Sequence, residues 1–195
     1  MTKKITAVLL ALFLMMSMTS FGLASGEEWT YRSESISCAM LDRLATRSGP
    51  GTQYAEPGTF FRNNAWKGKS VQVLKKAQGD GIWWVQVDFR TNDGNRYRVW
   101  TGRKRVEVNL DLVREEIPVG DCDISPTGNT RWGPGENYAA ANVSIPTSAI
   151  GMLYETENGW CDVEYFCDNG DYGRVWIPAE CVHNVDTTTD RSGEN

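Results

Sequence analysis

Apolar and polar residues alternate along several short segments of the chain. Residues 71–74 (Val-Gln-Val-Leu) and 85–89 (Val-Gln-Val-Asp-Phe) repeat with a period of two, which is typical of half-buried β-strands. The Asn- and Gly-rich segments at 91–95 and 168–171 have the composition of tight turns. No segment after residue 24 combines the 3.6-residue helical period with capping residues. The pattern therefore predicts an all-β fold.

An internal repeat organises these strands. The segment 46–54 (TRSGPGTQY) returns as 130–138 (TRWGPGENY), with six of nine positions identical and an offset of 84. Three later matches share an offset of 76: Trp84–Val87 with Trp160–Val163, Arg98–Trp100 with Arg174–Trp176, and Val106 with Val182. Four matches in the same order, separated by one indel of eight residues, indicate two copies of one module.

The first 24 residues have the features of an export signal. Lys3 and Lys4 precede an apolar run at 5–16, and Gly22-Leu23-Ala24 supplies small residues at a cleavage site. The run is shorter than the roughly 20 residues that span a bilayer. We expect cleavage after Ala24 and a soluble product without a membrane span, secreted or extracellular, with attachment to the cell wall as one option.

The repeat and the signal together predict four regions. They are a signal peptide at 1–24, a first domain at 27–114, a second domain at 119–185 and a flexible tail at 186–195. A copy of this size has a small core and limited stability on its own. Residues 115–118 form a linker too short for independent tumbling.

Charge differs strongly between the two copies. The whole chain has 20 basic and 25 acidic residues, and removing residues 1–24 takes away two lysines and leaves a net charge of −7. Residues 25–116 carry 15 basic and 12 acidic groups (+3), whereas residues 117–195 carry 3 and 13 (−10). An acidic product argues against nucleic acid as a partner. The asymmetry indicates two binding tasks, attraction between the halves, or unrelated solvated surfaces.

The repeated motif Arg-x-Gly-Pro-Gly-x-x-Tyr, at 47–54 and 131–138, is followed in each copy by a strand with Trp and by a late Val-Trp pair. This arrangement resembles the bacterial SH3-like (SH3b) domain family of exported and cell-wall proteins. The resemblance covers about 39–108 and 120–183. It implies two small SH3-like β-barrels in tandem, each five-stranded, with a ligand surface lined by aromatic residues between two loops.

The resemblance also implies which residues bind the ligand. Those we expect are Trp84, Trp160, Tyr54, Tyr138, Trp132 and Pro178. Strand parity places Trp84 and Trp160 on the polar faces of their strands, where a Trp either serves as a ligand platform or packs against a long loop. Pro178 matches a proline of the SH3 peptide groove, whereas Cys181 replaces its tyrosine, so we expect wall glycan or stem peptide rather than a proline-rich helix.

All five cysteines follow the predicted signal peptide. They are Cys38, Cys122, Cys161, Cys167 and Cys181. In an exported protein cysteines more often form disulfides than metal sites. Cys161 and Cys167 lie six residues apart on one predicted strand, about 20 Å, and cannot pair with each other. The first and last strands meet in barrels of this family, so we expect a disulfide between Cys122 and Cys181, which leaves Cys38 as a free thiol or a link to another chain.

Composition also bears on catalysis. Cys181 and His183, the only histidine, lie two residues apart and could form a nucleophile–base pair. No segment remains for a catalytic domain, so we expect no enzyme, no metal and no cofactor. The leading hypothesis is an exported binding protein for cell-wall peptidoglycan or another surface partner. The alternative is a secreted protein-interaction or inhibitor module. The first requires Trp160 to line an open cleft, whereas the second is compatible with its burial.

Overall fold

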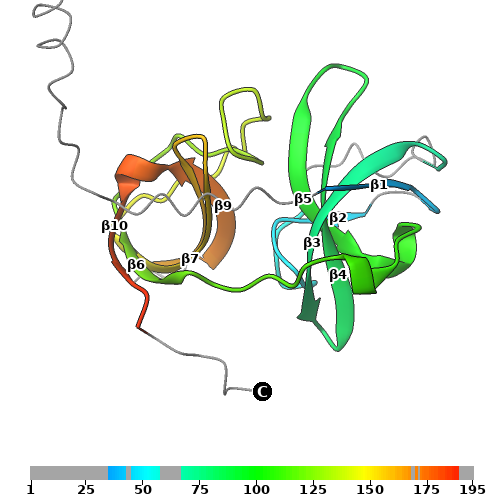
Figure 1. Cartoon of the computed structure of the whole chain (residues 1–195). Helices are drawn as coiled ribbons and strands as arrows, with labels where there is room; N and C mark the ends of the chain where they lie inside the picture. The colour runs from blue at the N-terminus through cyan, green and yellow to red at the C-terminus, as the bar shows by residue number, and fades with distance from the viewer. Residues whose placement is uncertain (1–34, 43–44, 58–66, 168–169, 171, 189–195) are drawn as a thin grey trace, which may run out of the picture.

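The computed structural model describes residues 35–42, 45–57, 67–167, 170 and 172–188. The predicted signal peptide lies outside the described residues. The described chain is all-β and forms two antiparallel five-stranded sheets that lie side by side (Figure 1). The all-β prediction is therefore confirmed. In the described residues no helix is both long and apolar enough to span a membrane.

The first module is the sheet of strand order β1-β3-β4-β5-β2. Its elements are β1 (Ile36–Ala39), β2 (Thr46–Arg47), β3 (Ser70–Gly79), β4 (Ile82–Arg90), β5 (Arg96–Gly102) and the 3₁₀ helices η3 (Arg103–Arg105) and η4 (Leu110–Leu112). The alternating segment 85–89 predicted from the sequence lies within β4, with Val85, Val87 and Phe89 in the core.

The second module is the sheet of strand order β10-β6-β7-β8-β9. Its elements are β6 (Gly120–Ile124), β7 (Ala149–Glu157), β8 (Trp160–Cys167), β9 (Tyr172–Pro178), the 3₁₀ helix η5 (Ala179–Cys181) and β10 (Val182–Asp186). Asp186, predicted as the start of the tail, is the last residue of β10, and residues 189–195 lie outside the description.

The two sheets repeat each other in detail. An isolated bridge between Met40 and Val106 takes the place of the β6–β10 pairing, and one between Arg131 and Trp176 takes the place of the β2–β5 pairing. Both long hairpins also have a register shift at equivalent points, after Val73 in β3 and after Leu153 in β7. The topology therefore supports the duplication, but the sheets do not close into barrels.

The repeated Gly-Pro-Gly-x-x-Tyr motif packs in the same way in both copies. A Cβ atom added at Gly49 would overlap the ring of Tyr54, and one at Gly133 would overlap the ring of Tyr138. The spacing between glycine and tyrosine thus reflects a ring packed directly on the backbone.

The predicted disulfide between Cys122 and Cys181 is not formed, and all five cysteines are unpaired. The first and last strands of the second module do pair, but Val182 lies opposite Ile124 and the Ser125 amide donates to the Cys181 carbonyl. Cys181 therefore lies about three residues, or about 10 Å, along the strand from Cys122, whereas disulfides need Cα atoms within about 7 Å.

The other thiols also have definite positions. Cys161 and Cys167 lie on β8, as expected, and both are buried. Burial raises the pKa of Cys122 to about 12, with smaller contributions from Cys161 and the flanking aspartates. Burial likewise raises the pKa of Cys38. The Cys38 and Cys122 thiols are therefore held in the protonated, unreactive form.

Candidate functional site

The six predicted ligand-binding residues are all buried. Trp84 is 6% exposed and its indole nitrogen donates to the Gly79 carbonyl at 3.1 Å. Trp160, its equivalent, is 8% exposed and lies opposite Pro178 on β9. These aromatic side chains therefore do not line an open cleft, and two of them, Tyr54 and Tyr138, contact the other module.

Tyr54 and Tyr138 make reciprocal hydrogen bonds across the junction between the modules. The Tyr54 hydroxyl donates to Glu164 at 2.9 Å, and the Tyr138 hydroxyl donates to Asp88 at 2.5 Å. Tyr54 is equivalent to Tyr138 by the 84-residue offset, and Asp88 to Glu164 by the 76-residue offset. The two copies therefore face each other with an approximate two-fold relation.

Two equivalent arginines follow the same relation. The Arg98 guanidinium lies 5.4 Å from the ring centre of Trp176, and the Arg174 guanidinium lies 5.4 Å from that of Trp100. Each arginine thus contacts the tryptophan of the opposite copy at a distance suited to a cation–π interaction.

Lys75 lies at the centre of the junction. Its ammonium is 2.8 Å from Glu155, the equivalent residue on β7, 2.8 Å from Glu116 and 3.5 Å from Asp162. Only 1% of the Lys75 side chain is exposed. Burial lowers the pKa of Lys75, but the three carboxylates outweigh it and raise the pKa, so the amine stays charged.

Arg174 completes this buried network with two bidentate ion pairs. It binds both oxygens of Glu116, at 2.8 and 2.6 Å, and both oxygens of Asp162, at 3.0 and 2.7 Å. Burial alone would raise the pKa of each carboxyl, but Arg174 and Lys75 lower both pKa values below their usual range. Paired geometry of this kind compensates the cost of burying charge.

Arg98, the equivalent of Arg174 in the first module, forms ion pairs that are less completely buried. It contacts Asp88 at 3.0 Å and Glu157 at 2.6 Å, and the Glu157 side chain is 32% exposed. The polar strand faces that carry Asp88 and Asp162 are thus buried against each other and are not solvated. Lys75 and Glu155 have opposite charges, but their equivalence follows from the strand register and from neither of the two sequence offsets.

An open pocket lies elsewhere on the first module, around Trp83. It has a volume of about 660 Å³ and is lined by Asp42, Ile82, Trp83, Gly102, Arg103, Lys104, Arg105 and Leu110. The Lys76 ammonium lies 5.0 Å from the centre of the Trp83 ring and donates to the Leu110 carbonyl at 3.0 Å. The pocket therefore combines the Trp83 ring, which packs against Lys76, with the three basic residues of η3.

The second module lacks this chemistry at the equivalent positions. Gly159 replaces Trp83, Ala179 replaces Arg103 and Glu180 replaces Lys104. Sequence reasoning selected the adjacent Trp84 because it recurs in both copies. Trp83 was missed because it occurs in only one.

The remaining candidate chemistry is sparse. The His183 ring forms a hydrogen bond of 2.9 Å with the Ser125 hydroxyl, and Cys181 lies in η5. Within the described residues no group of three or more His, Cys, Asp or Glu side chains is placed to hold a metal ion. Comparisons with family models, curated proteins and solved structures find no match for this chain.

Proposed function

We propose that this chain is an exported, non-catalytic binding protein of two SH3-like modules, and that the Trp83 pocket takes the anionic glycan–peptide of the cell wall. The observation that carries this proposal is the pocket itself, in which one half-buried tryptophan lies beside Arg103 and Lys104, both exposed. The cleft that wall binding was expected to need at Trp160 is absent from the described part of the chain, so the proposal rests on Trp83 instead of on the aromatic groove.

The strand order supports the SH3-like assignment. In the first module the 3₁₀ helix η3 follows β5, and Val106 then pairs with Met40 at the end of β1. In the second module η5 follows β9, and β10 then pairs with β6. The pocket lies at η3. It is therefore built from the segment in which the resemblance predicts part of the ligand groove.

The chemistry of the pocket suits peptidoglycan. Its sugar rings offer apolar faces that pack on an indole, and its stem peptides carry carboxylates that pair with Arg and Lys. Because Arg105 already contacts Asp42 at 3.2 Å, we assign ligand charge pairing chiefly to Arg103 and Lys104. Binding should weaken with added salt, since these groups are at the surface.

Co-sedimentation with purified peptidoglycan tests the proposal. Residues 25–195 should pellet with the polymer, and Trp83→Ala or the pair Arg103→Ser with Lys104→Ser should reduce the bound fraction at least five-fold. Glu180→Ala, at the equivalent of Lys104 in the second module, is the matched control. Failure of the unaltered protein to pellet, or equal binding by all variants, would contradict the proposal.

The burial of Trp160 favours the second hypothesis, a secreted protein-interaction module. A protein-interaction module needs a binding surface other than the aromatic groove. The second module has such a surface on the part of its sheet that lies outside the junction.

A further inference from the structure

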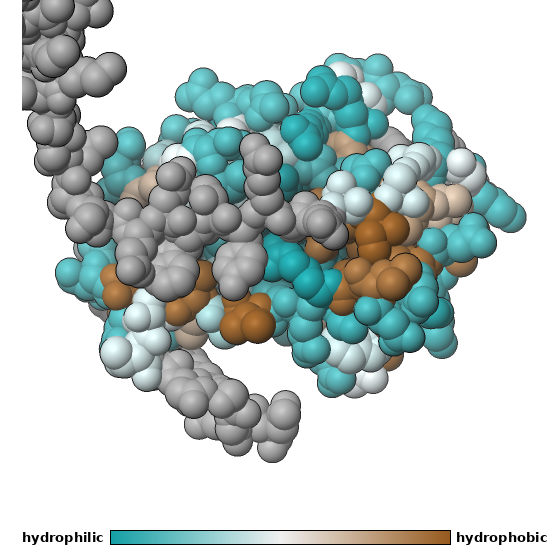
Figure 2. All heavy atoms as spheres, viewed as in Figure 1, coloured by the Kyte–Doolittle hydropathy of each residue, from teal (hydrophilic) through white to brown (hydrophobic). Residues whose placement is uncertain are grey.

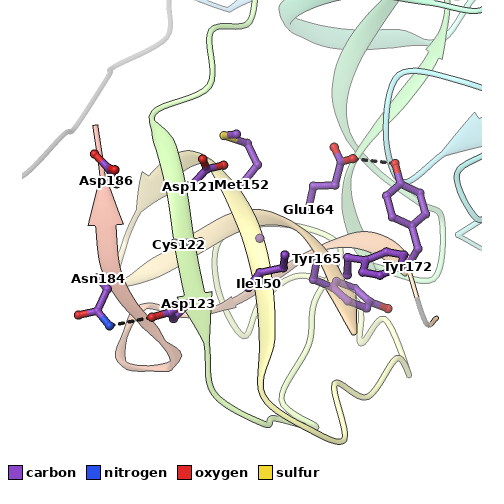
Figure 3. Close-up of a pocket in the computed structure, with 12 residues that line it drawn as sticks. Asp121, Cys122, Asp123, Ile150, Met152, Glu164, Tyr165, Tyr172, Asn184 and Asp186 are labelled. Atoms are coloured by element: carbon purple, nitrogen blue, oxygen red, sulfur yellow. Dashed lines mark hydrogen bonds between the residues drawn. The ribbon is translucent and has the colours of Figure 1, made fainter. Parts of the chain in front are cut away.

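The outer face of the second sheet is hollowed into a groove of about 470 Å³. Figure 3 shows the acidic side chains of β6 and β10 on one side of this groove, with Ile150 on β7 and Tyr172 on β9 across from them. The lining residues, all in the described part of the chain, are Asp121, Cys122, Asp123, Ile150, Gly151, Met152, Glu164, Tyr165, Phe166, Tyr172, Asn184 and Asp186. They include four carboxylates and no Lys or Arg.

Strand register orders this groove into two rows across the sheet. One row runs His183, Asp123, Ile150, Phe166, Tyr172, and the other runs Asp186, Asp121, Met152, Glu164, Arg174. His183 and Arg174, at the ends of these rows, do not line the groove. Asp121, Asp123 and Asp186 lie on its β10–β6 side, and the β7–β9 side carries Ile150, Met152, Phe166 and Tyr172 together with Glu164.

The apolar residues of the groove are conspicuously open to solvent. Ile150 is 67% exposed, Phe166 52% and Tyr172 41%. Figure 2 shows that hydrophobic side chains reach the surface over both modules among hydrophilic ones. A contiguous exposed group of this kind on one sheet face is a feature of interaction sites.

The first module shows that the fold does not require this composition. At the equivalent positions Ser70 stands for Ile150, Arg90 for Phe166 and Arg96 for Tyr172. Ser37 and Ala39 likewise stand where the second module has Asp121 and Asp123. The same strands thus form with small or basic side chains on this face, so the groove is an addition made by one copy.

The neighbouring part of the same face indicates what the groove would take. The groove continues into the junction through Glu164, which accepts from Tyr54 of the first module. Beside it, Glu155 contacts the Lys75 ammonium and Glu157 contacts Arg98. This sheet face therefore already binds a polypeptide surface through cationic and aromatic side chains.

We propose that the part of this face outside the junction binds an extended segment of another protein, in which cationic residues are followed by apolar ones. The cations would lie against Asp121, Asp123 and Asp186, and the apolar side chains against Ile150 and Phe166. Five strands span four spacings of about 4.8 Å, or about 19 Å, which an extended segment of about six residues covers. Charge complementarity would fix its direction, and the apolar side chains would supply most of the affinity.

A fluorescein-labelled peptide, Lys-Lys-Lys-Val-Phe-Val, tests this proposal by fluorescence anisotropy with residues 25–195. It should bind at least ten-fold more tightly than Glu-Glu-Glu-Val-Phe-Val and Lys-Lys-Lys-Ser-Ser-Ser. Two variants borrow the residues of the first copy: Ile150→Ser with Phe166→Arg, and Asp121→Ser with Asp123→Ala. Each should weaken binding at least ten-fold while leaving the thermal unfolding midpoint nearly unchanged.

The matched control is Ser70→Ala with Arg90→Ala on the equivalent face of the first module, which should leave the affinity unchanged. No binding of the lysine peptide at millimolar protein, equal binding of the three peptides, or affinity insensitive to both groove variants would overturn the proposal. The Trp83 pocket is a separate site. Peptidoglycan co-sedimentation by the groove variants should therefore be unaffected, which keeps failure here distinct from failure of the proposed function.

Discussion

The two modules share a scaffold but differ on the surfaces they leave free. Several residues repeated in both copies, among them Tyr54 and Tyr138 and the Arg and Trp of the two Arg-Val-Trp triplets, meet at the junction and are buried. The residues present in only one copy form the basic pocket at Trp83 and the acidic groove at Phe166. The surface that joins the copies is therefore built partly from residues identical in both and partly from residues of opposite charge such as Lys75 and Glu155, whereas the candidate ligand sites lie where the copies diverge.

The largest expected effect comes from breaking the centre of the junction. Lys75→Met leaves the carboxylates of Glu116, Glu155 and Asp162 buried with one cation fewer, which should cost about 3–5 kcal/mol of unfolding free energy. Urea unfolding followed by tryptophan fluorescence measures this loss. Lys67→Met, at an exposed position, should change stability by less than about 0.5 kcal/mol; similar values for the two variants would contradict the account.

The two equivalent arginines allow a sharper comparison. Arg174→Lys gives up two forked contacts with fully buried carboxylates and should cost about 2–3 kcal/mol. Arg98→Lys should cost less, about 1–2 kcal/mol, because its partner Glu157 is partly exposed. The same urea experiment ranks them, and the reverse order would show that the network is not centred on Arg174.

The reciprocal tyrosines should also differ. Tyr138→Phe removes a hydrogen bond to the buried Asp88 and should cost about 1.5–3 kcal/mol. Both acceptors keep other donors, Arg96 and Arg98 at Asp88 and Tyr154 and Tyr172 at Glu164. Tyr54→Phe should nevertheless cost less, about 1 kcal/mol or less, because Glu164 is only partly buried. Thermal unfolding of both variants checks this difference, and equal costs would show that the acceptor environments are equivalent.

Lowering the pH should destabilise the protein through the same buried network, because its carboxylates become protonated. Burial raises the pKa values of Glu116 and Asp162, but the nearby Arg174 and Lys75 outweigh burial and lower both pKa values in the folded protein. Their stabilisation is therefore complete above the unfolded-state values of about 4 and is lost as the pH falls below them. Urea midpoints between pH 7 and pH 3 should be flat down to about pH 5 and then decrease. A flat profile to pH 3 would contradict the pairing.

Much of the fold could be predicted from the sequence. The alternation at 85–89 gave the correct core face of β4, and the Gly-Pro-Gly-x-x-Tyr repeat predicted two copies of one unit. These signals are local, because side-chain parity and backbone sterics act over a few residues. The position of Cys181 was not predictable in this way, since it depends on how β10 is aligned against β6.

The site was predicted less well for a related reason. Trp84 and Trp160 lie on polar strand faces, which suggested a ligand platform. Whether such a face meets water, a ligand or the other copy depends on the docking of the two modules, and that docking rests on contacts between residues about 80 positions apart, such as Lys75 and Glu155. The alternation of apolar and polar residues within one copy does not show how the modules dock. Opposite charges at equivalent positions, such as Lys75 and Glu155, do bear on it.

The most direct test of the junction is a double-mutant cycle between Lys75 and Glu155. Lys75→Met, Glu155→Gln and the double variant are unfolded in urea at pH 7, and the coupling free energy is the departure from additivity. We expect a coupling of about 1–3 kcal/mol, because the two groups are 2.8 Å apart and buried. Additivity within about 0.5 kcal/mol would contradict the packing of the two copies through their polar faces.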